Sequence, residues 1–353
     1  MSTDLLSTLG IRYPIIQAPM ANISSAALAA AVSEAGALGS IAVGAMTADG
    51  ARAAIRAVRE KTGRPFQVNV FTHVPAQADA AREAAWIDWL RPHFERFGAQ
   101  PPAALNEIYG TFVTDDAMFE VMLAERPAVL SFHFGLPPQQ KIDALKAAGI
   151  ILFASATSLD EARQIEAAGI DAIVAQGIEA GGHRGTFDPQ APDAALPTVE
   201  LLQQLHGKTS LPLIAAGGIM DGAQIRTALY YGASAVQMGS AFIACPESSA
   251  SSHHRAQIAG GAGLETELTA VISGRAARGI VNRQFRDVGA SGHPPVPDYP
   301  IAYDAAKQLH AAALAKGNQG FSVNWGGTNF ARARAMPAAE LVAALVAEMK
   351  ETV

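Results

Sequence analysis

Short apolar runs recur along this chain, and each is separated from the next by a segment with helical spacing. β-branched and other apolar residues fill the runs, which is typical of parallel strands buried on both faces. We predict eight such strands, at Tyr13–Met20, Leu38–Val43, Phe66–Phe71, Ala128–Gly135, Ile151–Thr157, Ala172–Gly177, Pro212–Gly218 and Ala235–Phe242. Eight strands linked by crossover helices favour a (β/α)8 TIM barrel of the α/β class over an open, doubly wound sheet.

Helical segments lie between most of the predicted strands. The best defined are at Ser25–Glu34, Ala51–Lys61, Leu159–Ala168 and Asp221–Tyr231. Ser24 or Ser25 is expected to cap the first of them. A final helix over Pro337–Val353 has an apolar face, with which it would cover the outside of the barrel.

Two stretches interrupt the alternation. The stretch from His73 to Pro127 inserts two or three helices after the third strand. A second stretch, from Pro246 to about Lys307, mixes serine, histidine, glycine, arginine and proline after the eighth strand. We therefore predict a barrel over residues 1–245, a smaller, mainly helical inserted domain over 246–309, and a C-terminal segment over 310–353 that returns to the barrel.

Charge and targeting signals narrow the class of protein. Charged residues make up 16% of the chain and the net charge is −6 with no basic block, which argues against nucleic-acid binding. Met1 to Gly10 lacks the cationic start and apolar core of a signal peptide. The most apolar early stretch, 26–46, is interrupted by Glu34 and glycines. We expect a cytoplasmic protein without membrane attachment, either a monomer or a homodimer.

Cysteine and histidine usage gives no sign of a metal site. Cys245 is the single cysteine, so internal disulfides and a cysteine-based zinc site are excluded. We expect it to be a small buried hydrophobic residue rather than a reactive thiol. The pair His253-His254 has no third ligand at suitable spacing and is expected to lie in a solvated loop.

Barrel enzymes carry their sites on the loops after the carboxyl ends of the strands. Glycines are concentrated there: ten of the 32 glycines lie between Gly177 and Gly239. After the seventh and eighth predicted strands, glycines would let backbone N–H groups approach an anion closely. This pattern predicts a cofactor that carries a phosphate.

Amide and imidazole side chains follow several of the same strands. Asn69 and Gln176 could match the donor and acceptor edge of a flavin ring, or could instead hold a loop in place. His183 follows two glycines and suits proton transfer or anion binding. For His133, between two phenylalanines, a core or supporting role competes with direct ligand contact.

Seven segments together carry a resemblance to a known family. They are Pro14–Met20, Gln67–Asn69, Ser131–Pro137, Gln176–Gly185, Ala216–Gly222, Gln237–Phe242 and Gly274–Asn282. In order and spacing they resemble the nitronate monooxygenases, once called 2-nitropropane dioxygenases, and in particular the class I bacterial members. The resemblance covers nearly the whole chain.

The resemblance implies a barrel that binds FMN without a covalent bond and a smaller helical domain that forms one wall of the site. It implies FMN contacts from Met20, Asn69, Gln176, Gly181, Gly218, Gln237, Met238, Gly239 and Ser240. It implies His183 and His133 as catalytic residues and a substrate wall of Tyr109, Tyr299, Tyr303 and Lys307. The implied reaction oxidises alkyl nitronates, such as propionate 3-nitronate, with O2 to carbonyl products and nitrite.

The chain departs from the family pattern at two places. Ala21-Asn22-Ile23 stands where family members usually have a glycine pair, which would narrow the space near the flavin. Near the C-terminus, the chain reads Trp325-Gly326-Gly327-Thr328 in place of Trp-x-Gly-Gln. Both departures bear on substrate preference more than on cofactor binding.

Two other functions remain open from the sequence. One is an FMN-dependent NAD(P)H reductase that acts on quinones or enoyl thioesters, because such enzymes share the barrel and the phosphate site. The other is a flavin-binding protein without turnover. An enzyme of the IMP dehydrogenase type would need a nucleophilic cysteine after the sixth strand, and Glu179–Gly185 contains none.

Overall fold

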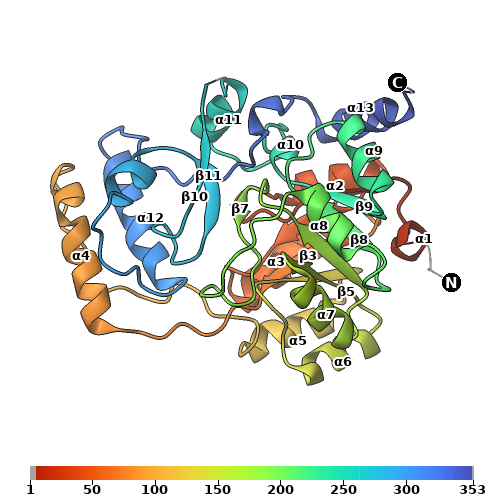
Figure 1. Ribbon diagram of the computed structural model, residues 1–353, viewed down its shortest axis with the longest axis horizontal. Coiled ribbons are helices and arrows are strands. Elements are labelled where there is room, and N and C mark those ends of the chain that lie inside the picture. Colours follow the sequence, from red (N-terminus) through yellow and green to blue (C-terminus); the bar gives the residue numbers. More distant parts are fainter. Residues whose placement is uncertain (1–4, 262, 352–353) are drawn as a thin grey trace.

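Eight parallel strands form one sheet in the computed structural model, which describes residues 5–261 and 263–351 (Figure 1). The strands are β1 (Ile15–Gln17), β2 (Gly39–Ala42), β3 (Phe66–Phe71), β4 (Val129–His133), β5 (Ile151–Ala156), β6 (Ala172–Gln176), β8 (Leu213–Ala216) and β9 (Ala235–Met238). Their order in the sheet is β1-β9-β8-β6-β5-β4-β3-β2. Each predicted strand is therefore present. The residues before Leu5, which the signal-peptide prediction includes, lie outside the described residues.

The two edges of the sheet meet, so the sheet closes into a barrel. Ile16 of β1 forms a parallel bridge with Leu38, the residue before β2. Two backbone hydrogen bonds complete this seam, from Gln17 N to Leu38 O at 2.9 Å and from Leu38 N to Ile15 O at 2.9 Å. The predicted (β/α)8 barrel is confirmed.

Helices cover the outside of the barrel. They are α2 (Ala26–Glu34), α3 (Ala48–Arg59), α5 (Asp116–Glu125), α6 (Gln139–Ala147), α7 (Leu159–Ala167), α8 (Thr198–Leu205), α9 (Gly222–Tyr230) and α13 (Ala338–Lys350). The short helix α1 (Leu5–Leu9) packs instead against the amino-terminal end of the barrel interior. Ser25 caps α2, accepting a hydrogen bond from Leu28 N, and Asp221 caps α9 in the same way. The last helix, α13, packs against α2 and α9 on the barrel exterior. Its predicted extension to Val353 runs past the last described residue, Glu351.

Some predicted strands extend too far at their carboxyl ends. The eighth was predicted to continue to Phe242, but β9 ends at Met238 and a short helix, α10 (Ser240–Ile243), begins directly after Gly239. Ala241, Phe242 and Ile243 of α10 are buried, so the apolar run continues although the strand has ended. Apolar content by itself does not distinguish a strand from a short buried helix.

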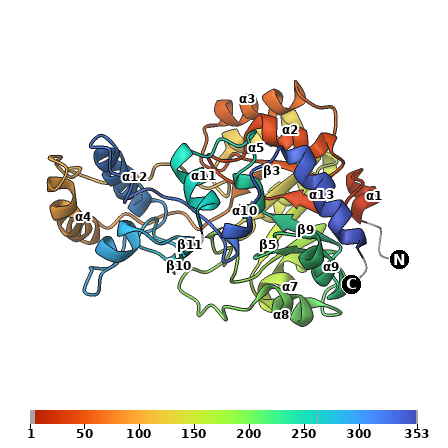
Figure 2. The same cartoon turned by 90° about the horizontal axis from the view of Figure 1, so that it is seen from above.

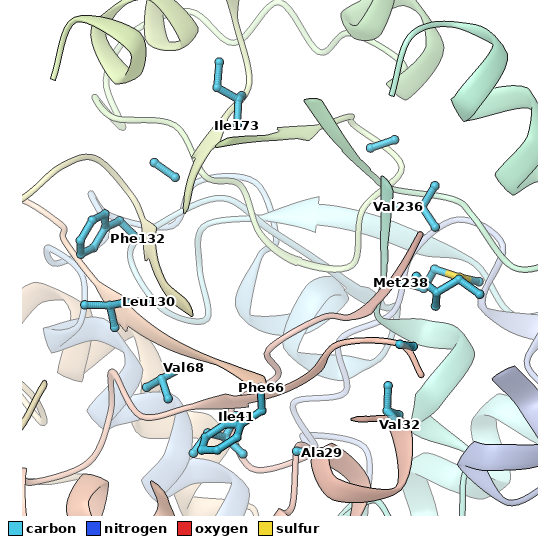
Figure 3. Close-up of a cluster of buried hydrophobic side chains, with 14 of the residues drawn as sticks. Ala29, Val32, Ile41, Phe66, Val68, Leu130, Phe132, Ile173, Val236 and Met238 are labelled. Atoms are coloured by element: carbon cyan, nitrogen blue, oxygen red, sulfur yellow. The ribbon is translucent and has the colours of Figure 1, made fainter. Parts of the chain in front are cut away.

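Side chains alternate along each strand between two apolar layers. Outward-facing residues pack against the surrounding helices, and Figure 3 shows part of this outer layer, including Val68, Leu130, Ile173 and Val236. A second cluster fills the amino-terminal end of the barrel interior; its members include Ile16, Leu38, Val129, Phe153, Val174, Ile214 and Ala235. Two residues further along five of these inward-facing rows, the side chains become polar, as Ser40, Ser131, Ser155, Gln176 and Gln237 show.

A second apolar core lies beside the barrel. It joins α4 (Ala80–Glu95) from the stretch after β3 to α12 (Ile301–Leu314), and both views show these two helices side by side, away from the barrel (Figures 1 and 2). Trp86 and Leu90 of α4 pack in one cluster with Leu309 of α12 and with Phe321. The predicted 246–309 domain thus does not form this core alone, because α4, predicted as part of the barrel, contributes to it. An amphipathic helix does not reveal in its own sequence which partner will cover it.

The segment after β9 is also less uniformly helical than predicted. Besides α11 (Ser252–Ala259), a π-helical turn (Gln284–Val288) and α12, it contains the strands β10 (Thr266–Thr269) and β11 (Ala277–Ile280). These strands form an antiparallel sheet with β7 (Gly182–His183), which comes from the loop after β6. The loop that carries His183 is therefore held to the inserted segment by backbone pairing. In the part of the chain that the structure describes, no helix combines the length and apolarity needed to cross a membrane.

The contact between α2 and β2 gives a test of the packing. A Cβ atom on Gly39 would overlap the carbonyl oxygen of Ala29 in α2, and backbone atoms cannot move aside as a flexible side chain can. Replacing Gly39 with alanine should destabilise the protein by about 3 kcal/mol, the upper range for overpacking. Urea unfolding measures this change.

The matched control is Gly63→Ala, since the space around Gly63 is open and its backbone is unstrained. Equal unfolding midpoints for the two variants would contradict the proposed close contact.

Candidate active site

A cavity of about 530 Å³ opens at the carboxyl ends of the barrel strands, in the range usual for small-molecule and cofactor sites. The strand ends form one side of it, and residues on and near α12 form the other. All of the side chains and glycines predicted from the sequence line this one cavity: Met20, Asn69, Tyr109, His133, Gln176, Gly181, His183, Gly218, Gln237, Met238, Gly239, Ser240, Tyr299, Tyr303 and Lys307. The structure thus brings the whole predicted set together, although the set spans nearly 290 residues of sequence.

Amide groups line the floor of the cavity. Asn69 Nδ2 donates to the backbone oxygen and to Oγ of Ser131, at 3.1 and 2.9 Å, and Gln67 Nε2 donates to the same Oγ at 2.7 Å. Gln67 Oε1 and Gln237 Oε1 are buried and have no hydrogen-bond partner among the described residues. Because unpaired buried acceptors are costly, these oxygens fit a ligand that presents N–H groups to the floor.

Gln67 was not among the residues selected from the sequence. It lies two positions before Asn69 in β3, and alternate residues of a strand face the same side. That spacing, within the motif Gln67–Asn69, is the signal that could have identified it.

Glycines form the opposite end of the cavity. Gly218 has a φ of +72°, which favours glycine, and Asn329 Nδ2 donates to its carbonyl oxygen at 2.7 Å. The N–H groups of Gly218 and Gly239 make no hydrogen bond within the described ranges. Gly181 lies so close to the backbone of Gly327 that a Cβ atom would come within 2.5 Å of its nitrogen. Gly181, Gly218 and Gly239 together are called the glycine cradle below. Their closely packed backbone, with free N–H donors on Gly218 and Gly239, fits a phosphate group.

Gln176 holds the loop that carries His183. Its Nε2 donates to the backbone oxygen of His183 at 3.0 Å, and its Oε1 accepts from Gly185 N at 2.7 Å. Of the two functions considered for this amide, the hydrogen bonds match loop positioning. Its side chain also lines the cavity, so a ligand can still contact it.

Arg184 is a second anchor of this loop and is not among the residues predicted from the sequence. The guanidinium is fully buried and forms two hydrogen bonds with the carboxylate of Asp193, at 2.7 and 2.9 Å. Its third nitrogen donates to the backbone oxygens of Gln176 and Gly177 at 3.0 and 3.1 Å. Such a fully paired cation fixes the loop after β6 in one geometry.

His183 stands among aromatic rings in the cavity wall. Its ring centroid lies 5.3 Å from those of both Tyr299 and Trp325, and its Nε2 lies 2.8 Å from Oγ of Ser273. Burial, with smaller contributions from His133, Arg275 and His73, lowers the pKa of His183 to about 3. The imidazole is therefore neutral at neutral pH.

His133 supports His183 from below. Its Nδ1 lies 2.9 Å from Oγ of Ser155 and its Nε2 lies 3.1 Å from the backbone oxygen of His183. Since a carbonyl oxygen only accepts, Nε2 must carry the proton. Burial lowers the pKa of His133 to about 4. Both ring nitrogens are thus engaged with the protein, which is the geometry of a positioning residue rather than of a free acid or base.

Tyrosines and one lysine form the wall opposite the strands. The hydroxyl of Tyr109 donates to that of Tyr299 at 2.8 Å, and burial raises the pKa of Tyr303 to about 12. Lys307 Nζ lies over the ring of Tyr303, 4.8 Å from its centroid, and forms no ion pair with a described carboxylate. Partial burial lowers the pKa of Lys307. This wall offers hydroxyl donors and one unpaired amino group to a ligand.

The first departure from the family pattern keeps the backbone shape of a glycine. Asn22 has a φ of +62°, and asparagine tolerates this left-handed region better than most residues. Ile23 N donates to Met20 O at 3.1 Å, and Met20 N donates to Oγ of Ser24 at 2.9 Å, so the turn is tightly closed. Ala21, Asn22 and Ile23 all line the cavity, where their side chains occupy space that glycines would leave open.

The prediction that His253-His254 lies in a solvated loop is wrong. Both residues belong to α11, which Ser251 caps, and His254 is buried with its Nε2 3.1 Å from the backbone oxygen of Trp325. The serine-rich sequence before the pair lacks the apolar spacing that would have indicated a helix.

Among the described residues, no group of three or more histidine, cysteine, aspartate or glutamate side chains is arranged to hold a metal ion. Cys245 is buried, and burial raises the pKa of its thiol to about 12.

Comparisons with known proteins show what this chain is similar to. The family model described as nitronate monooxygenase matches residues 2–348. Nitronate monooxygenase of Pseudomonas aeruginosa is 55% identical, over 99% of this chain and 100% of its own length. That of Paraburkholderia phytofirmans is 57% identical, over 99% and 95%.

Two solved structures are similar to this chain over nearly its whole length. Nitroalkane oxidase from Streptomyces ansochromogenes matches with a TM-score of 0.89 and 38% identity, covering 98% of this chain and 97% of that one. FabK from Thermotoga maritima matches with a TM-score of 0.74 and 27% identity, over 99% and 96%.

The buried histidines predict how stability depends on pH. Burial lowers the pKa of His73 and of His254 to about 4, whereas an unfolded histidine titrates near 6.5. Between these values the unfolded chain binds more protons, so stability is full above pH 6.5 and falls as the pH decreases toward 4. Each buried histidine should contribute up to about 1.4 kcal/mol per pH unit in this window.

Replacing His73 with phenylalanine removes one of these groups and keeps an aromatic ring against Phe134 and Tyr299. The urea midpoint, measured from pH 7 to pH 5, should then fall less steeply than that of the wild type. Parallel curves would show that His73 titrates normally in the folded protein.

Proposed function

The chain belongs to the nitronate monooxygenase family, and on this premise we propose that it is an FMN-dependent enzyme that oxidises alkyl nitronates with O2 to carbonyl compounds and nitrite. The observation that carries the proposal is the position of His183 at the mouth of the barrel, in a cavity with amide, glycine and tyrosine walls. Its membership in the family makes the protein an oxidoreductase. The identity of the cofactor, the oxidant and the products belongs to the proposal.

The residues of the cavity fit FMN. The backbone donors of Gly218 and Gly239, with Ser240, would hold the phosphate, and the amides of Asn69 and Gln237 would face the polar edge of the ring. Met20 would contribute apolar contacts, whereas the side chain of Met238 packs in the outer layer of the barrel and leaves only its backbone near the ligand. When bound, FMN supplies the electron acceptor for a substrate that is already an electron-rich anion.

His183 can serve this chemistry in its neutral form. A neutral imidazole with one unprotonated ring nitrogen can accept a proton from a nitroalkane, which gives the nitronate. The surrounding rings of Tyr299, Trp325 and Phe134 exclude water and keep the group uncharged. His133 and Gln176 act through His183, because both bind its backbone oxygen.

Lys307 indicates which nitronates the site favours. Its amino group reaches the cavity without a carboxylate partner from the described residues. A substrate with a second negative charge would supply that partner, and propionate 3-nitronate carries a carboxylate at one end and the nitronate at the other. We therefore include acidic nitronates as the preferred substrate class.

The main alternative function is an NAD(P)H-dependent reductase. The anaerobic absorbance spectrum of the flavin distinguishes it from a nitronate monooxygenase. The purified protein should show flavin absorbance, and anaerobic addition of ethylnitronate should bleach it, whereas NADH should not. Bleaching by NADH alone would favour the reductase. A yellow protein that responds to neither would be a flavin-binding protein without turnover.

The substitution His183→Asn tests the role of the histidine. Asparagine keeps a polar side chain but cannot accept a proton, so kcat/KM for a nitroalkane should fall at least about 100-fold. The flavin spectrum should remain, since His183 is not in the glycine cradle. Turnover like that of the wild type, with flavin bound, would remove His183 from the mechanism.

The substitution Lys307→Met tests the substrate class. The KM for propionate 3-nitronate should rise about 10-fold, which is the loss of one charged hydrogen bond, while the KM for ethylnitronate should change little. Lys316→Met, an exposed position just after α12, is the matched control and should alter neither value. Equal effects on both substrates would mean that Lys307 does not bind the carboxylate.

A further inference from the structure

We propose that Ser273 sets the tautomer of His183, so that Nε2 carries the ring proton and Nδ1 presents a lone pair to the cavity. The assignment itself depends only on hydrogen-bond geometry. Its consequence for turnover rests on the function proposed above.

Ser273 has the contacts needed to impose one tautomer. It is fully buried, and its Oγ lies 2.8 Å from His183 Nε2. The same hydroxyl donates to the backbone oxygen of Arg275 at 3.2 Å, and the backbone N–H of Arg275 points at Oγ from 3.4 Å. A serine hydroxyl has one proton to donate and two lone pairs to accept.

Counting these donors and acceptors assigns the proton. When the hydroxyl donates to Arg275 O, only its lone pairs remain for His183, so Nε2 must be the donor. In the opposite arrangement, the hydroxyl donates to Nε2, and the backbone oxygen of Arg275 loses the donor that reaches it among the described residues. The first arrangement uses every hydrogen-bonding group of Ser273 and is the more stable one.

The other ring nitrogen of His183 is left for a ligand. Nδ1 has no hydrogen-bond partner among the described residues, and the side chain lines the cavity. The neighbouring rings of Tyr299 and Trp325 pack edge to face against the imidazole and do not donate a hydrogen bond to Nδ1. With Nε2 protonated, Nδ1 is therefore the proton acceptor toward substrate.

The turn that carries Ser273 is held rigidly in place. Gly274 has a φ of +90°, and a Cβ atom there would come within 2.6 Å of the backbone nitrogen of Tyr299, so the turn packs directly against the segment with this tyrosine. The buried guanidinium of Arg275 donates to the backbone oxygens of Thr186 and Phe187, at 2.7 and 3.2 Å. Ser273 is thus tied both to the loop after His183 and to the tyrosine wall.

Nuclear magnetic resonance can observe the tautomer without turnover. In the flavin-bound protein labelled with ¹⁵N-histidine, long-range proton–nitrogen correlations show which ring nitrogen carries the proton, and His183→Asn assigns the signal. We expect Nε2–H and an unprotonated Nδ1 in the wild type and in Ser273→Thr, which keeps the hydroxyl. Ser273→Ala should give a mixture of both tautomers.

The matched control is Ser248→Ala. Ser248 is also a buried serine that donates to a backbone oxygen, that of Ile243, but it is not bonded to any of the described histidines. A wild-type signal with the proton on Nδ1 would overturn the proposal, as would an unchanged signal in Ser273→Ala. If Ser273→Ala does not fold, the wild-type signal and that of Ser273→Thr still decide the assignment.

Kinetics test the consequence. In Ser273→Ala, kcat/KM for a nitroalkane should fall about 10-fold, the effect of one lost hydrogen bond, with recovery in Ser273→Thr and no change in Ser248→Ala. A correct tautomer in a protein inert toward nitronates and nitroalkanes would refute the proposed function and leave the assignment intact. The reverse result, full turnover with the other tautomer, would refute the assignment alone.

Discussion

Closure of the parallel sheet is the constraint on which the rest of this structure depends. The seam between β1 and the residue before β2 leaves no free edge, so alternate residues of every strand must point into the barrel. At the amino-terminal end these residues are apolar and fill the interior, as Phe153 and Ile214 do. At the carboxyl end the same rows continue as polar side chains, of which Asn69 and Gln176 are examples. One geometric rule thus produces a solid base and a polar cavity above it.

The electrostatics of the site follow from burial more than from paired charges. His183 and His133 are surrounded by rings and backbone groups, so both stay neutral far below their ordinary range. The buried cations Arg184 and Arg275 serve the architecture, because they donate to backbone oxygens of the loop that carries His183. Positive charge toward a ligand comes instead from Lys307, across the cavity. The site thus combines a neutral base, His183, with a cation on the opposite wall, Lys307, and this arrangement suits an anionic substrate.

Much of the barrel and of the candidate site could be predicted because the relevant signals are local. Strands such as β5 and β6 are largely apolar runs with clear ends, and the residues at their carboxyl ends face the cavity in any barrel. Errors arose where a segment needs a distant partner. The helix α4 was assigned to the barrel although α12 covers it, and His254 was placed in solvent although Trp325 covers it. The sequence around α4 or around His254 does not show which distant segment packs against it.

By itself, the sequence determined the number and order of the βα units and the glycines after the last two strands, and its resemblance to a known family implied the set of side chains at the mouth of the barrel. Only the tertiary structure decided what those side chains do. Gln176 became a loop anchor, His133 a support with no free nitrogen, and Ser273 a partner of His183 from 90 residues further along the chain. The reason is physical: strand and helix periodicity act over a few residues, whereas hydrogen bonding and desolvation depend on which distant groups the closed barrel brings together.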